Sequence, residues 1–319
     1  MEMNPHMRGR ELTIRAPMAN LCNVDGRIVP EDDARVPVLD RGFLFGDSIY
    51  EVVRTSGGVP FGWAEHWARL CTSADGLRMR LDLDEAKVAQ RVAATVAAAN
   101  HGDSYVRIVV TRGTGTAPNI DLSYASGPPF WLIMVRPLPD LSGKPARLCI
   151  VDRLRNDRRA LDPATKSGNY LNNVLALAEA KDRGATDCVM LNVDGHVTEA
   201  STSNLFARVN GVWCTPPLGA GILAGITRAM LLAFLPSVGE KVAERELGAN
   251  DLRTAEELFL SSSLRDIAPV THLDGKALHG GAPGPRTMQL FEKWKPWATQ
   301  RHRTQDAPHW QRLLERAGR

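Results

Sequence analysis

Two residues, Lys166 and Glu199, stand in surroundings that favour chemistry. Lys166 opens the run Lys-Ser-Gly-Asn-Tyr-Leu-Asn-Asn, directly before a helical pattern at residues 171–183. A lysine near the positive end of a helix, and partly withdrawn from water, loses some preference for its charged form. A neutral amine is a nucleophile that forms a Schiff base with an aldehyde. The alternative interpretation is an ordinary solvated lysine on the surface.

Glu199 heads the run Glu-Ala-Ser-Thr-Ser-Asn, which precedes a strand pattern at residues 204–209. Small polar residues let the backbone and the hydroxyls approach a ligand closely. A carboxylate at the head of this run can face a pyridine nitrogen and keep it protonated. The alternative is a turn carboxylate with no ligand. Together, Lys166 and Glu199 suit a protein that holds a cofactor with an aldehyde and a pyridine ring.

A glycine-bearing turn enters the helical pattern at residues 227–235. The free N–H groups of Ile226 and Thr227, with the Thr227 hydroxyl, suit a phosphate. The same pattern is equally compatible with an ordinary helix cap.

Ser262 and Ser263 end a strand pattern and can add hydroxyls to this anion site. Arg69 lies in a helical pattern and can supply a permanent positive charge, although a surface ion pair is its simpler interpretation. These residues extend the predicted anion site beyond one helix terminus.

Composition excludes several classes of protein. The chain has 319 residues, 44% hydrophobic and 24% charged, as in ordinary soluble globular proteins. The net charge of +3 comes with no long basic run, which argues against nucleic-acid binding. No apolar stretch approaches the roughly 20 residues of a membrane helix. Five scattered cysteines indicate reduced thiols in a cytoplasmic protein, and no cluster indicates a metal site.

Hydrophobic periodicity predicts alternating helices and strands. In the first half it predicts helices at 64–78 and 84–100, and strands at 105–110 and 130–135. In the second half it predicts helices at 171–183 and 227–235, and strands at 146–151, 188–192, 204–209, 212–214 and 257–260.

These elements predict a mixed α/β (α+β) protein with two domains. Prolines and small polar residues interrupt the pattern near residues 136–144, which favours a linker there. The expected division is an N-terminal extension at 1–20, a small domain at 21–138, a linker at 139–145, a large domain at 146–290 and a tail at 291–319. The tail is basic, contains three tryptophans and is expected to be a helical appendage.

Taken together, these segments resemble the fold-type IV pyridoxal-phosphate enzymes. That family includes branched-chain aminotransferases, D-amino-acid aminotransferases and aminodeoxychorismate lyases. The resemblance extends from about residue 20 to about residue 290, and its specific segments are residues 41–47, 66–70, 166–171, 198–206, 225–228 and 259–270. It implies a small N-terminal α/β domain, a larger C-terminal α/β domain, an active site between them and a homodimer.

The resemblance also implies a role for each matching residue. Lys166 would be the Schiff-base lysine and proton shuttle, and Glu199 would pair with the pyridine nitrogen of pyridoxal 5'-phosphate. Tyr170 would bind the phenolic oxygen of the cofactor. The phosphate would be held by a larger group: Arg69, Ile226, Thr227 and Ser263, with Ser262 adjoining.

The substrate-binding residues divide the possible subfamilies. Tyr105 and Arg107 share one face of a strand and resemble the Tyr-x-Arg element of branched-chain aminotransferases, which can bind a carboxylate. The following loop lacks the histidine of the Arg-x-His pair in D-amino-acid aminotransferases. Against the branched-chain interpretation, Leu264 and Arg265 stand where that group has alanines. They would reshape the turn, and Arg265 could bind an acidic substrate.

The resulting hypothesis is an aminotransferase that moves an amino group between an amino acid and a 2-oxo acid. A branched-chain-like L-amino acid is the favoured donor. A D-amino acid, an (R)-amine donor and an aminodeoxychorismate lyase remain alternatives. The alternative outside enzymes is a pyridoxal-phosphate-binding protein without turnover.

Overall fold

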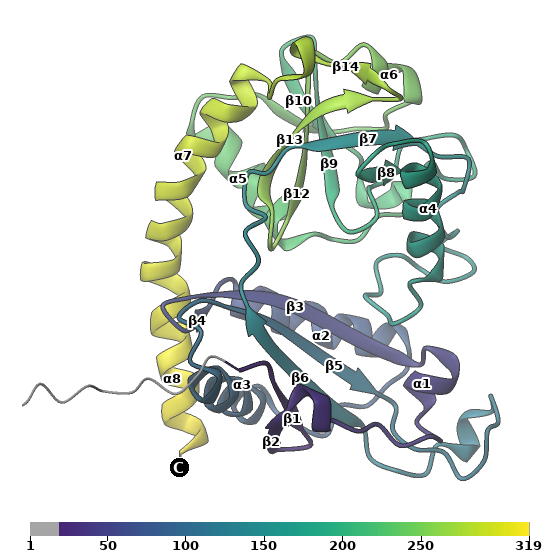
Figure 1. The fold of residues 1–319 in the computed structure, drawn as a ribbon, viewed down its shortest axis with the longest axis vertical. Coiled ribbons are helices and arrows are strands. Elements are labelled where there is room, and N and C mark those ends of the chain that lie inside the picture. The colour runs from purple at the N-terminus through teal and green to yellow at the C-terminus, as the bar shows by residue number, and fades with distance from the viewer. Residues whose placement is uncertain (1–18, 319) are drawn as a thin grey trace, which may run out of the picture.

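The computed structural model of the protein describes residues 19–318, so most of the expected N-terminal extension lies outside the described residues. Two sheets organise the chain (Figure 1). The first is antiparallel, with the strand order β2-β1-β6-β5-β3-β4. Its strands are β1 (Leu21–Val24), β2 (Arg27–Pro30), β3 (Ser48–Ser56), β4 (Val59–Pro60), β5 (Ser104–Thr111) and β6 (Phe130–Pro137).

Alternation along β5 divides the first sheet into a packed face and a face toward the rest of the molecule. Val106, Ile108 and Val110 are buried in a core with helices α2 (Trp63–Gly76) and α3 (Glu85–Ala99). Because side chains alternate along a strand, Tyr105 and Arg107 point to the opposite face. The two helices between β4 and β5 lie where the periodicity predicts them, and they cover the packed face of the sheet.

The second sheet is mixed, with the order β11-β10-β9-β12-β13-β7-β8 and β14 paired to β13. Its strands are β7 (Ala146–Ile150), β8 (Asp187–Val189), β9 (Asn204–Val209), β10 (Val212–Thr215), β11 (Val242–Glu244), β12 (Glu257–Ser262), β13 (Asp266–Leu273) and β14 (Lys276–Ala277). Its helices are α4 (Leu171–Asp182), α5 (Ile226–Ser237) and α6 (Ala249–Arg253). Helix α1 (Arg41–Phe45) precedes β3. Short 3₁₀ turns lie at Glu31–Asp33, Leu122–Tyr124, Leu218–Ala220 and His279–Gly281.

The C-terminal tail differs from the expected appendage. Helix α7 (Pro285–Arg301) begins before residue 291 and continues through a π-helical turn, η5 (His302–Asp306), into α8 (Ala307–Ala317). This helix runs along one side of the molecule past both sheets (Figure 1). Trp294 is 1% exposed and Trp310 is 4% exposed, and each belongs to a different hydrophobic core. The tail is thus an integral part of both cores, because its tryptophans bury large apolar surfaces.

The mixed α/β architecture predicted from the sequence is confirmed. The strand predicted at 188–192 is shorter and lies at Asp187–Val189, since the chain turns at residues 192–195. Strands β11 and β13 and helix α6 were not predicted. Within residues 19–318, no helix is long and apolar enough to cross a membrane. The division into domains at 139–145 stays a prediction, which limited proteolysis would test.

Candidate active site

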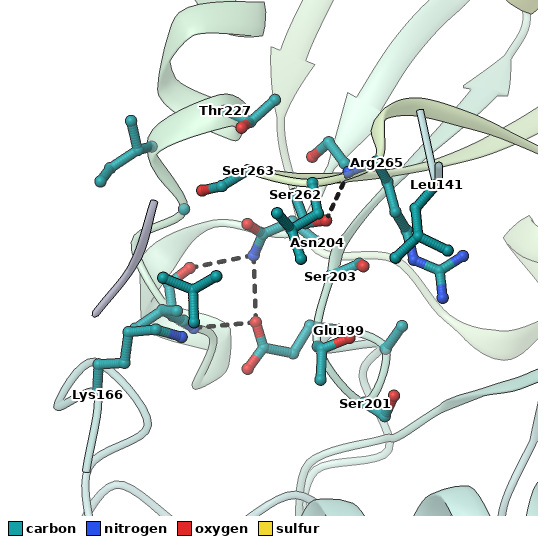
Figure 2. A pocket seen from close by; sticks show the side chains of 18 of the residues that line it. Leu141, Lys166, Glu199, Ser201, Ser203, Asn204, Thr227, Ser262, Ser263 and Arg265 are labelled. Atoms are coloured by element: carbon teal, nitrogen blue, oxygen red, sulfur yellow. Dashed lines mark hydrogen bonds between the residues drawn. The ribbon is translucent and has the colours of Figure 1, made fainter. Parts of the chain in front are cut away.

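A cavity of about 310 Å³ lies where the two sheets face each other. Every site residue predicted from the sequence lines it: Arg69, Tyr105, Arg107, Lys166, Tyr170, Glu199, Ile226, Thr227, Ser262, Ser263, Leu264 and Arg265. Figure 2 shows the Lys166 amine and the Glu199 carboxylate pointing toward the same space. Segments far apart in the sequence therefore meet in one site.

Lys166 lies before helix α4 and is held by strand β3 and helix α2. Its carbonyl accepts the Tyr50 N–H at 3.0 Å, and its N–H donates to the Ser73 hydroxyl at 3.0 Å. Its amine lies 3.4 Å from the Tyr50 hydroxyl and 4.4 Å from the centre of that ring. A Cβ on Gly168 would meet the Ser48 hydroxyl at 2.2 Å, so a larger residue here would displace that hydroxyl. The amine is thus fixed inside the cavity.

The segment 41–47 supports this arrangement. The Arg41 guanidinium donates to the carbonyls of Asn119, at 2.7 Å, and Ile120, at 2.9 Å, and so holds the long loop between β5 and β6. The Asp47 carboxylate accepts from both Arg41, at 3.1 Å, and Arg112, at 2.7 Å. These contacts brace the start of β3, which in turn positions Lys166.

Glu199 is held by donors from three different segments. One carboxylate oxygen accepts the Arg155 Nε–H at 3.1 Å. The other accepts the Asn204 amide at 3.2 Å and the Leu223 N–H at 3.1 Å. Burial raises the pKa of Glu199, while the charge of Arg155 and the Leu223 N–H act in the opposite direction. These donors favour a fixed carboxylate rather than a free side chain.

Arg155 was missed in the sequence. It lies in a loop without a periodic pattern, 44 residues from its partner, and it is 8% exposed. Its guanidinium also approaches the side-chain oxygens of Asn172 and Asn173 at 3.4 and 3.5 Å. The one available signal was chemical: a buried carboxylate needs a charged partner.

The predicted anion site lies at the N-terminus of α5. Its N-cap residue, Gly225, provides no side-chain cap, so the first N–H groups of the helix are free for a ligand. A Cβ at Gly225 would lie 1.8 Å from the Asn204 side-chain oxygen, which makes glycine necessary. Ser203 and Ser261 also line the cavity, and their buried hydroxyls have no hydrogen-bond partner among residues 19–318. Such orphaned donors are typical of a site built for a polar ligand.

Arg69 brings positive charge to the same terminus. Its Nη1 donates to the Ala224 carbonyl at 3.0 Å, and its other donors bind Glu51 at 2.7 and 2.8 Å. Burial acts to raise the pKa of Glu51, but Arg69 and then His66 outweigh it and lower the pKa to about 2. His66 binds Glu51 through Nδ1 at 2.7 Å and approaches the Ser263 hydroxyl through Nε2 at 3.4 Å. This network fixes the cation and orients the Ser263 hydroxyl.

The donor set fits a phosphorylated pyridine aldehyde. A helix terminus, a guanidinium and several hydroxyls suit a phosphate dianion. The amine of Lys166 suits an aldehyde, and the carboxylate of Glu199 suits a ring nitrogen. All of these groups open on the same cavity.

The first sheet contributes the aromatic and cationic wall of the cavity. Tyr105 and Arg107 lie on the same face of β5, as predicted, and the Arg107 guanidinium lies 4.1 Å from the centre of the Tyr50 ring. Tyr50 and Tyr170 meet edge to face, with ring centres 5.4 Å apart. Burial, and then the neighbouring Tyr170, raise the pKa of Tyr50. Tyr50 was missed because its strand pattern resembles that of any core strand.

Comparison with known proteins identifies the family. Residues 48–273 match the family model of the class IV amino-transferases. A protein of Methanocaldococcus jannaschii, whose name assigns it to the branched-chain-amino-acid aminotransferases, is 37% identical over 85% of this chain and 94% of its own length. The D-alanine aminotransferase of Bacillus licheniformis is 32% identical over 83% of this chain and 93% of its own length.

A solved structure has the same fold. The branched-chain amino acid aminotransferase of Thermobaculum terrenum, in its PLP-form, is 26% identical, with a TM-score of 0.78 over 89% of this chain and 96% of its own. The chain belongs to the class IV aminotransferase family, and the predicted fold-type IV architecture is confirmed. It is an enzyme of this class, and class IV aminotransferases use pyridoxal phosphate.

Proposed function

We propose that this protein uses pyridoxal 5'-phosphate to move an amino group between an amino acid and a 2-oxo acid. One observation carries the proposal. The Lys166 amine, the Glu199 carboxylate and the uncapped N-terminus of α5 open on one cavity. When bound, the cofactor draws electrons away from the substrate Cα and so acidifies its C–H bond.

The residues of the cavity supply the binding contacts in this proposal. The phosphate is assigned to Arg69, Ile226, Thr227 and Ser263, with Ser262 adjoining, because the helix terminus and the guanidinium meet there. Glu199 is assigned to the ring nitrogen, where its carboxylate would favour the protonated ring. Tyr170 is assigned to the phenolic oxygen, since its ring lies 5.9 Å from the Lys166 amine.

Lys166 moves the proton in this proposal. Its amine, once free, can accept a proton from the substrate Cα and deliver it elsewhere in the same cavity. Tyr50 Oη, 3.4 Å away, supplies a hydrogen-bond partner that holds the amine on the cavity side of β3.

For the substrate, we favour an L-amino acid of the branched-chain type, bound by Tyr105 and Arg107. The shared face of these two side chains and the similarity to the M. jannaschii protein support this donor. A D-amino acid is the second candidate, because the B. licheniformis D-alanine aminotransferase is similar over most of both chains.

We further propose a homodimer in the cytoplasm. Phe43, Ile120 and Leu171 are 69%, 79% and 74% exposed, and their segments are joined by hydrogen bonds of Arg41 and of Asn169. Exposed apolar side chains that gather in this way favour a protein interface. The five free cysteines support a reducing compartment. Light scattering of the purified protein tests the dimer, and cell fractionation tests the location.

A spectral donor panel tests the function. Protein purified with vitamin B6 is mixed with L-amino acids, D-amino acids or (R)-amines, and then with one 2-oxo acid. Transamination predicts an absorbance band near the visible edge that bleaches with the donor and recovers with the acceptor. Pyruvate release from aminodeoxychorismate would instead indicate the lyase. The absence of a response to every amine would contradict turnover.

A further inference from the structure

The turn between β12 and β13 carries an arginine into the cavity. Arg265 donates its backbone N–H to the Ser262 hydroxyl at 3.3 Å. The next residue, Asp266, has a left-handed backbone with a φ of 53°. The Arg265 carbonyl accepts the Gly143 N–H at 3.1 Å. The Asp266 carboxylate is itself held by Arg54 at 2.8 Å. The backbone of this turn is therefore fixed before any ligand arrives.

A buried aspartate orients the Arg265 side chain. Asp187 Oδ2 lies 3.5 Å from Arg265 Nη2, with side-chain exposures of 2% and 22%. The other oxygen, Oδ1, accepts the Ser201 hydroxyl at 2.6 Å and the N–H groups of Ser201 and Cys188 at 3.1 and 2.9 Å. Asp187 is thus locked in place.

The Arg265 guanidinium keeps free donors. Its 3.5 Å separation from Asp187 is longer than the roughly 2.7–2.9 Å of a charge-assisted hydrogen bond. Apart from this ion pair, the guanidinium forms no hydrogen bond within residues 19–318. Figure 2 shows this side chain extending beside Leu141 at the edge of the cavity. Asp187 therefore orients the guanidinium without saturating it.

The cavity as a whole carries excess positive charge. Its lining includes Arg69, Arg107, Lys166 and Arg265 but only one carboxylate, Glu199, in the described part of the chain. Glu51 neutralises Arg69, and Arg155 neutralises Glu199. Arg107 lies on a tyrosine ring and has no carboxylate partner within residues 19–318. Arg107 is thus left without a counter-charge, and Arg265, whose ion pair with Asp187 is long, keeps donors that can bind an anion.

We propose that Arg265, positioned by Asp187, binds a carboxylate of the substrate, and that it acts with Arg107 to favour a dicarboxylic 2-oxo acid as the acceptor for the branched-chain-type donor. A dicarboxylic 2-oxo acid would place one carboxylate on each arginine. A dicarboxylate would then form two charge-assisted hydrogen bonds with the arginines, whereas a monocarboxylate of the same length would form one. This inference rests on the proposed function for its substrate class.

The test compares acids of equal length on the cofactor-loaded enzyme. Arg265→Met and Arg265→Lys are measured with 2-oxoglutarate and with 2-oxopentanoate. Losing a hydrogen bond to a charged group costs about 1.5–3 kcal/mol, so Arg265→Met should raise the KM for 2-oxoglutarate roughly tenfold or more. Arg265→Lys should recover part of this loss because it restores the charge. Arg147→Met, an exposed arginine on β7 outside the cavity, is the matched control and should change neither KM.

The pattern across the two acids also assigns the carboxylate. A larger effect on 2-oxoglutarate than on 2-oxopentanoate places Arg265 on the distal carboxylate. An equal effect on both acids, with Arg107→Ala selective for 2-oxoglutarate, places Arg265 on the carboxylate next to the oxo group. A change below about twofold with both acids overturns the proposal.

Binding of glutarate separates this inference from the proposed function. Glutarate has two carboxylates and no oxo group, so calorimetry measures its affinity without any turnover. The enzyme should bind glutarate more tightly than pentanoate, and Arg265→Met should remove that preference. If no amine gives transamination but this preference exists, the proposed function fails and the carboxylate site stands. If glutarate and pentanoate bind equally, the carboxylate site fails whatever the activity.

Discussion

Arg69 and Arg107 face the same cavity and are held in opposite ways. The Arg69 guanidinium donates hydrogen bonds to the Glu51 carboxylate and to the Ala224 carbonyl. Arg107 has only the face of the Tyr50 ring, 4.1 Å away, and no carboxylate partner within residues 19–318. The wall around α5 is thus bound together before a ligand arrives, whereas the wall formed by β5 keeps donors free.

This difference matches two kinds of ligand. A cofactor that stays bound through many reactions is best served by fixed charges and dipoles, because these need no reorganisation. A substrate that enters and leaves needs donors that can be satisfied and then released. Under the proposed function, the rigid wall would hold the cofactor and the open wall would hold the substrate, and the following variants probe each of them.

Lys166→Ala should have the largest effect. A positioned proton-transfer group contributes about 10²–10⁴-fold, and this amine is also the proposed covalent anchor, so turnover should fall at least a thousandfold with the fold intact. Borohydride should then leave no pyridoxyl adduct at position 166, while Lys181→Ala, on the exposed side of α4, should keep the adduct. Normal activity of Lys166→Ala would refute the role of this residue.

Glu51→Gln should weaken the rigid wall in a pH-dependent way. Since Arg69 and His66 outweigh burial and lower the pKa of Glu51 from 4.5 to about 2, this carboxylate stabilises the fold above pH 4.5. That stability is lost as the pH falls toward 2. In urea unfolding without added cofactor, the free energy of unfolding at pH 7 should be about 3 kcal/mol higher for the wild type than for Glu51→Gln. This follows from a value on the order of 1.4 kcal/mol per pKa unit.

This difference in the free energy of unfolding between the wild type and Glu51→Gln should shrink below pH 4.5 and vanish near pH 2. Glu292→Gln, which removes an exposed ion pair with Lys295, provides the control and should change stability by less than about 1 kcal/mol. A stability difference between the wild type and Glu51→Gln that stays constant from pH 7 to pH 3 would argue against a carboxylate network at Glu51.

Arg107→Ala should affect the open wall alone. Loss of a charged donor to a substrate carboxylate costs about 1.5–3 kcal/mol, so the KM for 2-oxo acids should rise roughly tenfold or more. Cofactor retention should be unchanged, because Arg107 has no contact with the α5 terminus among the described contacts. An unchanged KM for every acid would remove the argument for the branched-chain type of donor.

Ser261→Ala should have the smallest effect and sharpen the contrast between the two walls. The buried hydroxyl has no hydrogen-bond partner in the described part of the chain, so its loss should leave the stability of the cofactor-free protein nearly unchanged. If a bound phosphate satisfies it, cofactor affinity should fall a few-fold, as for a hydrogen bond worth about 1 kcal/mol. Ser237→Ala, at the far end of α5, should alter cofactor affinity in no measurable way. Equal effects of both variants would exclude a local contact.

Much of the fold could be predicted from local patterns. Helices α2 and α3 and strands β5 and β6 follow from periodicity, because each buries a continuous apolar face. Strand β13 escaped prediction, since both of its faces are buried and its sequence shows no alternation. The basic and mostly polar composition of the tail favours an appendage, and only the packing reveals that Trp294 and Trp310 are buried.

Some residues of the candidate site could likewise be proposed from the sequence, and others were found only in the structure. Residue types and short-range spacing were enough to propose Lys166, Glu199 and the α5 terminus, which line one cavity, because their chemistry depends on local sequence. The partners Arg155 and Tyr50 were found only in the structure, where Arg155 meets Glu199 and Tyr50 meets Lys166.

The sequence by itself determined which groups can react, since side-chain chemistry and helix termini are local properties. Only the tertiary structure decided which of those groups are neutralised and which stay free. Ion pairs such as Arg69 with Glu51 and Arg265 with Asp187 join positions that no local pattern connects. The physical reason is that electrostatic interactions depend on distance in space, which the order of residues along the chain does not encode.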